Sequence, residues 1–260
     1  MSVLSEKEID SAADQLVNAY FAKKFTTPLT ERFPEMTTED AYKIQIRVVE
    51  KRCERGEVVV GMKAAYTNKA VQSRLGVDEP AFGHITDAMV KLENEPIPAS
   101  EMPRTIMEAE IGFIIGEEMC GPGVTVAKVL KGVYGVIPCI EVAGGNYERR
   151  GKVQDGMANL SNYMVIGGKI TSLKNLDLRH IGAIVEKNGE IVSTGTGAAA
   201  LGNPVHVLVW LVNKISKFGL KLLPGMFVIT GSIVPIVQIE VGDKCKATFD
   251  RLGSVSANFV

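Results

Sequence analysis

Two glutamates two residues apart, Glu108 and Glu110, open an apolar stretch in the sequence Met107-Glu-Ala-Glu-Ile111. The residues that follow, 112–115, are apolar and typical of a buried strand. Because residues i and i+2 of a strand point to the same face, we expect the two carboxylates to lie side by side. Two such charges are costly in a protein interior unless a cation or an exchangeable proton compensates them. Taken alone, the pair is also compatible with the solvated face of an amphipathic strand.

A third carboxylate, Glu141, follows another apolar run at residues 133–140. Three carboxylates, with water in the remaining positions, suit Mg²⁺ or Mn²⁺, which are hard ions that take oxygen ligands in octahedral geometry. We therefore expect Glu108, Glu110 and Glu141 to form one divalent-metal site.

The composition of the chain excludes several other classes of protein. Of its 260 residues, 46% are hydrophobic and 23% are charged, and the formal net charge is −1 with both signs interspersed, so no basic patch indicates nucleic acid. The most apolar stretch, residues 205–212, is far shorter than the roughly 20 residues that a membrane span needs. The polar start is unlike a signal peptide, and the 4 cysteines form no CxxC pair. We expect a cytoplasmic protein with reduced thiols and no membrane partner.

The elements that position these carboxylates change in type along the chain. Residues 5–24 have helical periodicity with Ser5 as N-cap, and a second helix opens at Thr38. From residue 58 onward the pattern is one of short strands and turns, and we expect strands at 58–60, 110–115, 133–137, 163–166, 181–186, 226–230, 236–240 and 245–249, with a closing segment at 252–259.

The second half of the chain adds two clear local signals. The sequence Lys187-Asn-Gly-Glu190 predicts a hairpin turn, and residues 205–218 predict a buried helix that Gly219 ends. Since the strands are not regularly separated by helices, the sequence predicts an α+β fold rather than a parallel α/β sheet. We expect an N-terminal helical region at 1–57 and a β-rich body at 58–260, built as a mixed-sheet roll or distorted barrel and forming one structural unit with the helices.

Short motifs from about residue 36 to the end of the chain occur in the order found in one enzyme family. They include Gly61-Met-Lys63, Thr67-Asn-Lys-Ala-Val-Gln72, Gly121-Pro-Gly-Val-Thr125, Val136-Ile-Pro-Cys139, Gly197-Ala-Ala-Ala-Leu-Gly202 and Leu252-Gly-Ser-Val255. Together they resemble the 2-oxopent-4-enoate hydratases and the vinylogous 2-oxo acid decarboxylases, a branch of the fumarylacetoacetate hydrolase superfamily. The resemblance implies a body of strands of that superfamily's C-terminal type around a Mg²⁺ or Mn²⁺ site, and a homo-oligomer.

The resemblance also assigns roles to individual residues. The family's metal ligands fall on the three glutamates already singled out. Its active-site lysine falls on Lys63, which we expect just after the strand at 58–60. The positions that contact the substrate fall on Ala81, Asn159, Ser161 and Ser232.

The family chemistry that this site would carry is metal-dependent hydration. The substrate, a 2-hydroxy-2,4-dienoate from the catabolism of aromatic compounds, presents a carboxylate and a 2-oxygen to the metal, which stabilises enolate charge. Water then adds to give a 4-hydroxy-2-oxo acid, and a general acid–base group moves the protons. The expected partner is therefore a small 2-oxo acid, and the resemblance also allows a complex with a partner enzyme of the same pathway.

Several positions depart from the hydratase pattern and keep other functions open. Ala81 stands where the hydratases carry an aspartate, Gly145 and Asn146 replace a Ser-Arg pair, and the aspartate that usually follows the alanine matched to Ala158 is missing. The related decarboxylases lack the first of these aspartates, so decarboxylation of a vinylogous 2-oxo diacid is the first alternative. A non-catalytic partner subunit is the second, although a pure scaffold has no need of three clustered carboxylates.

Hydrolysis of a C–C bond is a less favoured reaction for this chain. Hydrolases of the superfamily use a His–Glu pair to activate water, and the one histidine that precedes Glu108 is His84. We expect His84 to be structural.

Overall fold

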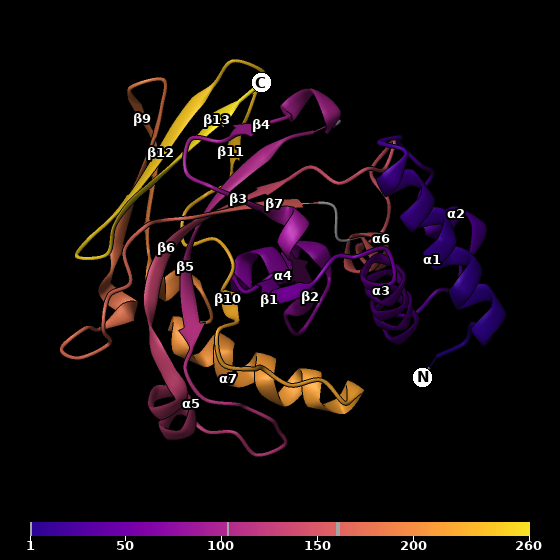
Figure 1. Ribbon diagram of the computed structural model, residues 1–260, viewed down its shortest axis with the longest axis horizontal. Coiled ribbons are helices and arrows are strands. Elements are labelled where there is room, and N and C mark those ends of the chain that lie inside the picture. The colour runs from indigo at the N-terminus through magenta and orange to yellow at the C-terminus, as the bar shows by residue number, and fades with distance from the viewer. Residues whose placement is uncertain (1, 103, 160–161) are drawn as a thin grey trace.

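The computed structural model describes residues 2–102, 104–159 and 162–260, which form two sheets with helices around them (Figure 1). The helices are α1 (Glu6–Phe21), α2 (Leu29–Arg32), α3 (Thr38–Cys53), α4 (Lys69–Leu75), α5 (Val126–Gly132), α6 (Val153–Ala158) and α7 (Pro204–Ile215). The strands are β1 (Val59–Ala65), β2 (Ala81–Thr86), β3 (Val90–Lys91), β4 (Pro96–Ile97), β5 (Ile106–Ile115), β6 (Val133–Ala143), β7 (Asn162–Ile166), β8 (Gly182–Lys187), β9 (Glu190–Thr196), β10 (Phe227–Ile229), β11 (Val237–Gln238), β12 (Lys244–Phe249) and β13 (Gly253–Phe259).

The strands form two mixed sheets that pack on each other. The larger sheet has the order β2-β1-β10-β5-β6-β7-β3, with β11 paired to β5, and the smaller has the order β4-β13-β12-β8-β9. Strand β6 is buried over most of its length, so both of its faces need cover, and β12 and β13 of the smaller sheet supply it on one side. The larger sheet curls into a half-barrel, which confirms the expected α+β roll.

The predicted hairpin turn is confirmed, but the predicted end of the strand at 133–137 is wrong. The hairpin between β8 and β9 turns at Asn188 and Gly189, which both have positive φ, as a type I′ turn requires. The expected strand at 133–137 stopped before Pro138, which has no N–H to donate. In the structure β6 continues to Ala143, because β5 pairs with it before and after the proline and β7 pairs with it from Cys139 onward.

Lys63 lies inside a strand and not after one. β1 extends to Ala65 because β10 pairs with one edge and β2 with the other, and this pairing outweighs the low strand propensity of Gly61. A side chain at Gly61 would place its Cβ 2.4 Å from the Phe227 carbonyl oxygen, so the close pairing depends on glycine. The short helices α4, α5 and α6 and the strand β2 were not among the expected elements, and β9 was expected only through the hairpin turn that precedes it.

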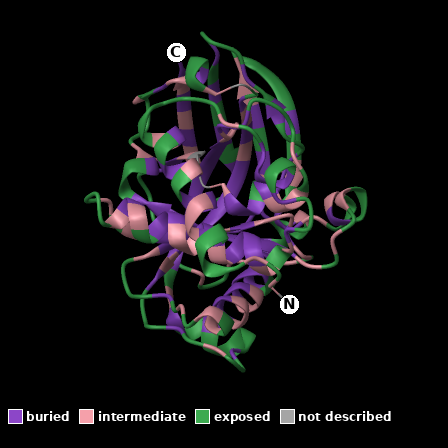
Figure 2. Ribbon diagram, turned by 90° about the vertical axis from the view of Figure 1, so that its right-hand side faces the viewer, coloured by how far each residue is buried: buried purple, intermediate pink, exposed green. Residues whose placement is uncertain are grey.

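The N-terminal helices pack beside one edge of the larger sheet. α1 begins with a capping box between Ser5 and Glu8, and α3 with one between Thr37 and Asp40. α1 packs on α3, and α3 on α6, so these helices gather at the side of the molecule away from the smaller sheet (Figure 1). Their apolar faces share one core with the strands (Figure 2). No helix of the described ranges is long and apolar enough to cross a membrane.

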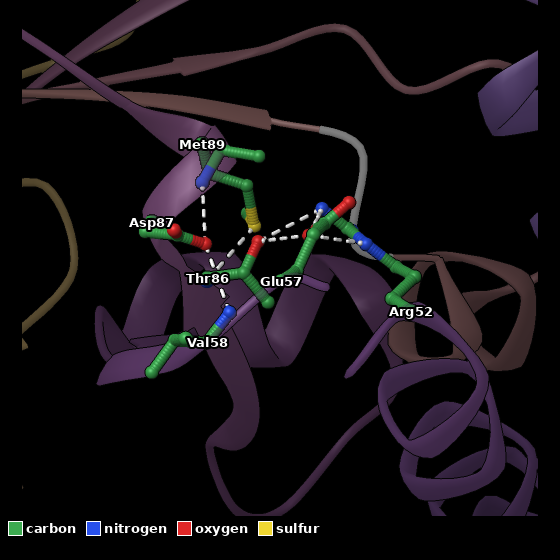
Figure 3. A network of polar contacts seen from close by, with 7 residues as sticks. Arg52, Glu57, Val58, Thr86, Asp87 and Met89 are labelled. Atoms are coloured by element: carbon green, nitrogen blue, oxygen red, sulfur yellow. Dashed lines mark hydrogen bonds and ion pairs between the residues drawn. The ribbon is translucent and has the colours of Figure 1, made fainter. Parts of the chain in front are cut away.

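A buried ionic network joins α3 to the sheet (Figure 3). The guanidinium of Arg52, at 1% exposure, donates to Glu57 at 2.6 Å and to the Thr86 hydroxyl at 2.9 Å. It also lies 3.9 Å above the ring of Tyr20 in α1. The network thus bridges the boundary proposed near residue 57, and the division into a helical region and a β-rich body remains a prediction.

We expect Arg52→Met to lower the free energy of unfolding by about 3–5 kcal/mol, because it leaves the Glu57 carboxylate in the interior without its partner. The double variant Arg52→Met/Glu57→Gln should recover part of that loss, since it removes the uncompensated charge. Urea denaturation measures both. Arg251→Met is the control, because Arg251 makes an exposed pair with Asp250 and its loss should change stability little. Equal losses for Arg52→Met and Arg251→Met would show that the buried network is unimportant.

Candidate metal and substrate site

Three carboxylates meet on one face of the larger sheet. Glu108 and Glu110 alternate along β5, and Glu141 on β6 lies directly opposite Glu108 in the antiparallel register. One carboxylate oxygen from each glutamate lies within 4.8 Å of the others. Glu110 is 0% exposed and Glu141 is 4% exposed. Their closeness follows from strand alternation within β5 and from the pairing of β5 with β6.

The loop after β10 fixes the innermost carboxylate. The backbone N–H of Gly231 donates to Oε2 of Glu110 at 2.6 Å. Gly231 has φ +84°, and a Cβ there would lie 2.2 Å from the Thr67 hydroxyl, so this donor position requires glycine. The other oxygen of Glu110, Oε1, is buried and has no hydrogen-bond partner in the described part of the chain. Such an oxygen is costly unless a cation meets it, and carboxylate oxygens are the donors that Mg²⁺ and Mn²⁺ prefer.

Burial and repulsion from neighbouring carboxylates oppose ionisation of Glu108 and Glu110. Burial, and then the charge of Glu141, raise the pKa of Glu108 to about 7. The same two causes, together with Glu108, raise the pKa of Glu110 well above its usual value. Without a cation the cluster therefore retains protons near neutral pH. A divalent ion would replace those protons, so the donor set fits a divalent metal ion.

Lys63 is the counter-ion of this cluster. Its ammonium group makes an ion pair with Glu141, and its side chain is 12% exposed. Burial disfavours the charged amine, but attraction to Glu141, Glu108 and Glu110 outweighs it and raises the pKa of Lys63 above its usual value. Lys63 is therefore protonated at neutral pH and can act as a fixed positive charge or as a proton donor, but not as a base.

The cluster borders a cleft of about 1940 Å³, which Glu108 and Glu141 line, while Glu110 is fully buried. Lys63, Ala81, Asn159 and Ser232 all line this cleft together with Glu108 and Glu141. Ser161 falls outside the described residues. The structure thus places most of the expected site residues around one cavity, while their roles remain predictions.

Two of the residues expected to contact the substrate, Asn159 and Ser232, also make hydrogen bonds within the protein. The Asn159 side-chain amide donates to Oδ1 of Asn146 at 2.6 Å, and the Ser232 hydroxyl donates to the Val234 carbonyl at 2.8 Å. The Ser232 side chain therefore also stabilises its own loop, and the Ser232 backbone makes a hydrogen bond to Glu108. Ala81 is almost fully buried on β2, opposite Ala65.

His84 lies outside the residues that line the cleft. Its Nδ1 is 3.1 Å from Oε1 of Gln45, whose amide donates to the carbonyls of Phe82 and Met157. Burial lowers the pKa of His84 to about 4, so the ring is neutral at physiological pH. These contacts give His84 a structural place between α3, β2 and α6.

Tyr66 and Arg150 also line the cleft, although no motif in the sequence marks them. Tyr66 follows Lys63 by three residues and has φ +58°, a left-handed conformation that is rare for an aromatic residue. Nothing in the sequence predicts that conformation. The doublet Arg149-Arg150, close behind Glu141 in the sequence, is a signal that could have indicated an anion site.

Comparisons with known proteins place this architecture in a family. Residues 58–260 match the profile of the fumarylacetoacetate (FAA) hydrolase C-terminal family. The chain belongs to this family. It is 43% identical over 218 residues to a 2-hydroxypent-2,4-dienoate hydratase of Pseudomonas putida. The aligned region covers 82% of this chain and 97% of that protein. It is 36% identical over 259 residues to a 2-keto-4-pentenoate hydratase of Paraburkholderia xenovorans (strain LB400). That alignment covers 98% of this chain and 96% of the hydratase.

A solved structure resembles the whole chain. The 4-oxalocrotonate decarboxylase from Pseudomonas putida G7, complexed with magnesium and adipate, matches with a TM-score of 0.95 and 32% sequence identity. The match covers 100% of both chains. The chain thus resembles both hydratases and decarboxylases of the family over nearly its full length.

We expect Glu108→Gln, Glu110→Gln and Glu141→Gln each to weaken Mn²⁺ binding by at least roughly tenfold while the fold persists. The metal-free fold should tolerate each change, because removing one carboxylate relieves repulsion within the cluster. Calorimetric titration with Mn²⁺ measures the affinity. Glu117→Gln, at an exposed position outside the cleft, is the control. Unchanged affinity in all three cluster variants would remove the metal site.

Proposed function

We propose that this protein is a divalent-metal-dependent hydro-lyase that adds water to a 2-hydroxy-2,4-dienoate to give a 4-hydroxy-2-oxo acid. The observation that carries the proposal is the cluster of Glu108, Glu110 and Glu141 with Lys63 as counter-ion, beside a cleft large enough for a small acid. The hydratases that the chain resembles at 36–43% identity support the reaction type. In line with the family resemblance, we propose the catabolism of aromatic compounds as the setting for this chain.

The three glutamates would hold the metal ion, and Mg²⁺ or Mn²⁺ suits their oxygen donors. Solved decarboxylase structures with magnesium and with calcium support a divalent ion here. When bound, the ion supplies positive charge where negative charge develops on the 2-oxygen of the substrate. Gly231 keeps Glu110 in place through its N–H, so the carboxylates need little rearrangement to accept the ion.

Lys63 would supply a positive charge and a transferable proton beside the substrate. Its protonated Nζ can hold the substrate carboxylate or donate a proton as the dienol becomes the 2-oxo-3-enoate. Water then adds its oxygen at C4, and a proton is delivered at C3. Ala81 presents no carboxylate to this chemistry, which leaves Lys63 as the main candidate for proton transfer. We propose that Asn159, Ser161, Ser232 and Ala81 contact the substrate.

Decarboxylation of a vinylogous 2-oxo diacid is the second candidate function. The full-length match to 4-oxalocrotonate decarboxylase favours it, as does the small residue at Ala81. Both reactions pass through an enolate next to the same carboxylate oxygens, so one metal site could support either.

Two further proposals concern assembly and location. We propose a homo-oligomer, which is supported by exposed apolar side chains on the β8–β9 hairpin: Ile184, Ile191 and Val192. A complex with a partner enzyme of the same pathway and a cytoplasmic location follow from the family resemblance and from the reduced cysteines.

The reaction type is tested with two substrates. With Mg²⁺ and 2-hydroxypenta-2,4-dienoate, we expect loss of the dienol ultraviolet absorbance together with formation of a 4-hydroxy-2-oxo acid, identified by mass. Release of CO₂ from a 2-oxo-3-enedioate is measured in parallel. If CO₂ release is the faster reaction, the decarboxylase function replaces the hydratase function.

Lys63→Met should lower kcat by a factor on the order of 10²–10⁴, the usual range for a general acid–base group. The variant also leaves Glu141 without its ion pair, so Mn²⁺ affinity is measured alongside to separate proton transfer from metal loss. Lys69→Met is the matched control, because Lys69 contacts Gln72 and does not line the cleft. Turnover at the wild-type rate by Lys63→Met would exclude Lys63 from the mechanism.

A further inference from the structure

Three segments that are distant in the sequence meet at the threonine that follows β1. Thr67 lies two residues after β1 and is 2% exposed, so its polar groups need partners within the protein. Its backbone carbonyl accepts a hydrogen bond from the N–H of Leu201 at 3.2 Å. Its hydroxyl donates to the backbone carbonyl of Thr230 at 3.0 Å. Thr67 thus joins the turn after β1 to the turn at 197–202 and to the loop after β10.

The contact with Thr230 begins where the pairing of β1 with β10 ends. The parallel register of the two strands runs as far as Lys63 on β1 and Ile229 on β10. Thr67 lies beyond the end of one strand and Thr230 beyond the end of the other. The Thr67 hydroxyl therefore holds the two chains together past the end of the ladder, beside the strand that carries Lys63.

The peptide group that accepts from Thr67 also supplies the donor to the innermost metal-site carboxylate. The carbonyl of Thr230 and the N–H of Gly231 belong to one planar peptide group, in which they point in opposite directions. Its oxygen accepts from the Thr67 hydroxyl, and its N–H donates to Oε2 of Glu110 at 2.6 Å. Because the group is planar, a donor that fixes the oxygen also fixes the direction of the N–H.

The peptide needs such a donor because glycine does not fix its orientation. Gly231 has φ +84° and no Cβ, so its backbone can adopt many conformations. The side chain of Thr230 is anchored elsewhere, since its hydroxyl donates to the Ile111 carbonyl on β5 at 2.9 Å. The peptide between Thr230 and Gly231 is therefore the part of this loop that is free to rotate when Thr67 does not hold its oxygen.

We propose that Thr67 is a positioning residue for the metal site. Its hydroxyl fixes the Thr230–Gly231 peptide so that the N–H of Gly231 stays on Oε2 of Glu110. The other oxygen, Oε1, which has no hydrogen-bond partner in the described part of the chain, is thereby left for the ion. Thr67 acts without touching the ion or the substrate. The inference rests on the proposed function, because the three glutamates must hold a metal ion.

Removal of the Thr67 hydroxyl tests this role through metal affinity. Thr67→Val keeps a side chain of similar size but cannot donate to the Thr230 carbonyl. In calorimetric titrations, we expect it to bind Mn²⁺ roughly threefold to tenfold more weakly, which is what one hydrogen bond is typically worth. Thr67→Ala should show the same loss, which covers the case in which valine prevents folding. Thr67→Ser retains the hydroxyl and should bind Mn²⁺ within about twofold of wild type.

Crystal structures of the metal-free variants give a second readout that does not depend on metal binding. In Thr67→Val and Thr67→Ala, we expect the peptide to rotate and the Gly231 nitrogen to lie more than about 3.5 Å from Oε2 of Glu110, beyond hydrogen-bond distance. In Thr67→Ser the hydrogen bond should persist.

Thr171→Val is the matched control for both readouts. The Thr171 hydroxyl is buried and makes no hydrogen bond with any described residue, and Thr171 does not line the cleft. Its replacement removes the same group from the same type of residue without releasing a partner. It should change neither the Mn²⁺ affinity nor the contact between Gly231 and Glu110.

Two results would overturn the proposal. One is wild-type Mn²⁺ affinity in Thr67→Val and Thr67→Ala with Gly231 still on Glu110, and the other is an equal loss of affinity in Thr67→Ser. A wild-type protein that binds no Mn²⁺ would contradict the proposed function. Rotation of the peptide in Thr67→Val would then still support the positioning of Glu110 by Thr67, and an unmoved peptide would overturn it.

Discussion

The repulsion among three buried carboxylates is the constraint on which the site depends. Glu108, Glu110 and Glu141 have oxygens within 4.8 Å of one another, on two adjacent strands in the centre of the larger sheet. A protein interior does not stabilise three such charges without compensation. Lys63 supplies one positive charge from β1, and the Gly231 N–H supplies a hydrogen bond from the loop after β10. The remaining negative charge needs protons or a divalent cation, and this requirement connects the fold to a metal-dependent function.

The rigid and the variable parts of the cleft have different origins. The metal end is built on the paired strands β1, β5 and β6, whose ladders hold the carboxylates and Lys63 to fixed positions. Other parts of the cleft lining come from connecting segments, with Tyr66 directly after β1 and Arg150 before α6. Connecting segments can change without disturbing the sheet, so relatives with one metal site can accept different substrates. Of the departures from the hydratase pattern, Ala81 opens β2, while Gly145 and Asn146 lie in the connecting segment after β6.

Much of this arrangement could be predicted from the sequence because it depends on short-range periodicity. The spacing of Glu108 and Glu110 places them on one strand face, and the runs before Glu141 and after Glu110 mark buried strands. What could not be predicted depends on partners distant in sequence. Pro138 indicates the end of a strand, but β6 continues beyond it to Glu141 because it is paired with β5 and, from Cys139 onward, with β7. The left-handed backbone of Tyr66, whose carbonyl accepts a hydrogen bond from Gln72 in the next helix, has no signature in the sequence.

The central claim is that one divalent ion occupies the space between the three carboxylates. Anomalous diffraction from crystals of the protein soaked in Mn²⁺ tests it most directly, because the signal locates the ion independently of any assay. The account expects one peak about 2.1 Å from an oxygen of each of Glu108, Glu110 and Glu141, the distance typical of hard divalent ions of this size. The absence of a peak at saturating Mn²⁺, or a peak elsewhere with the three carboxylates still clustered, would contradict it.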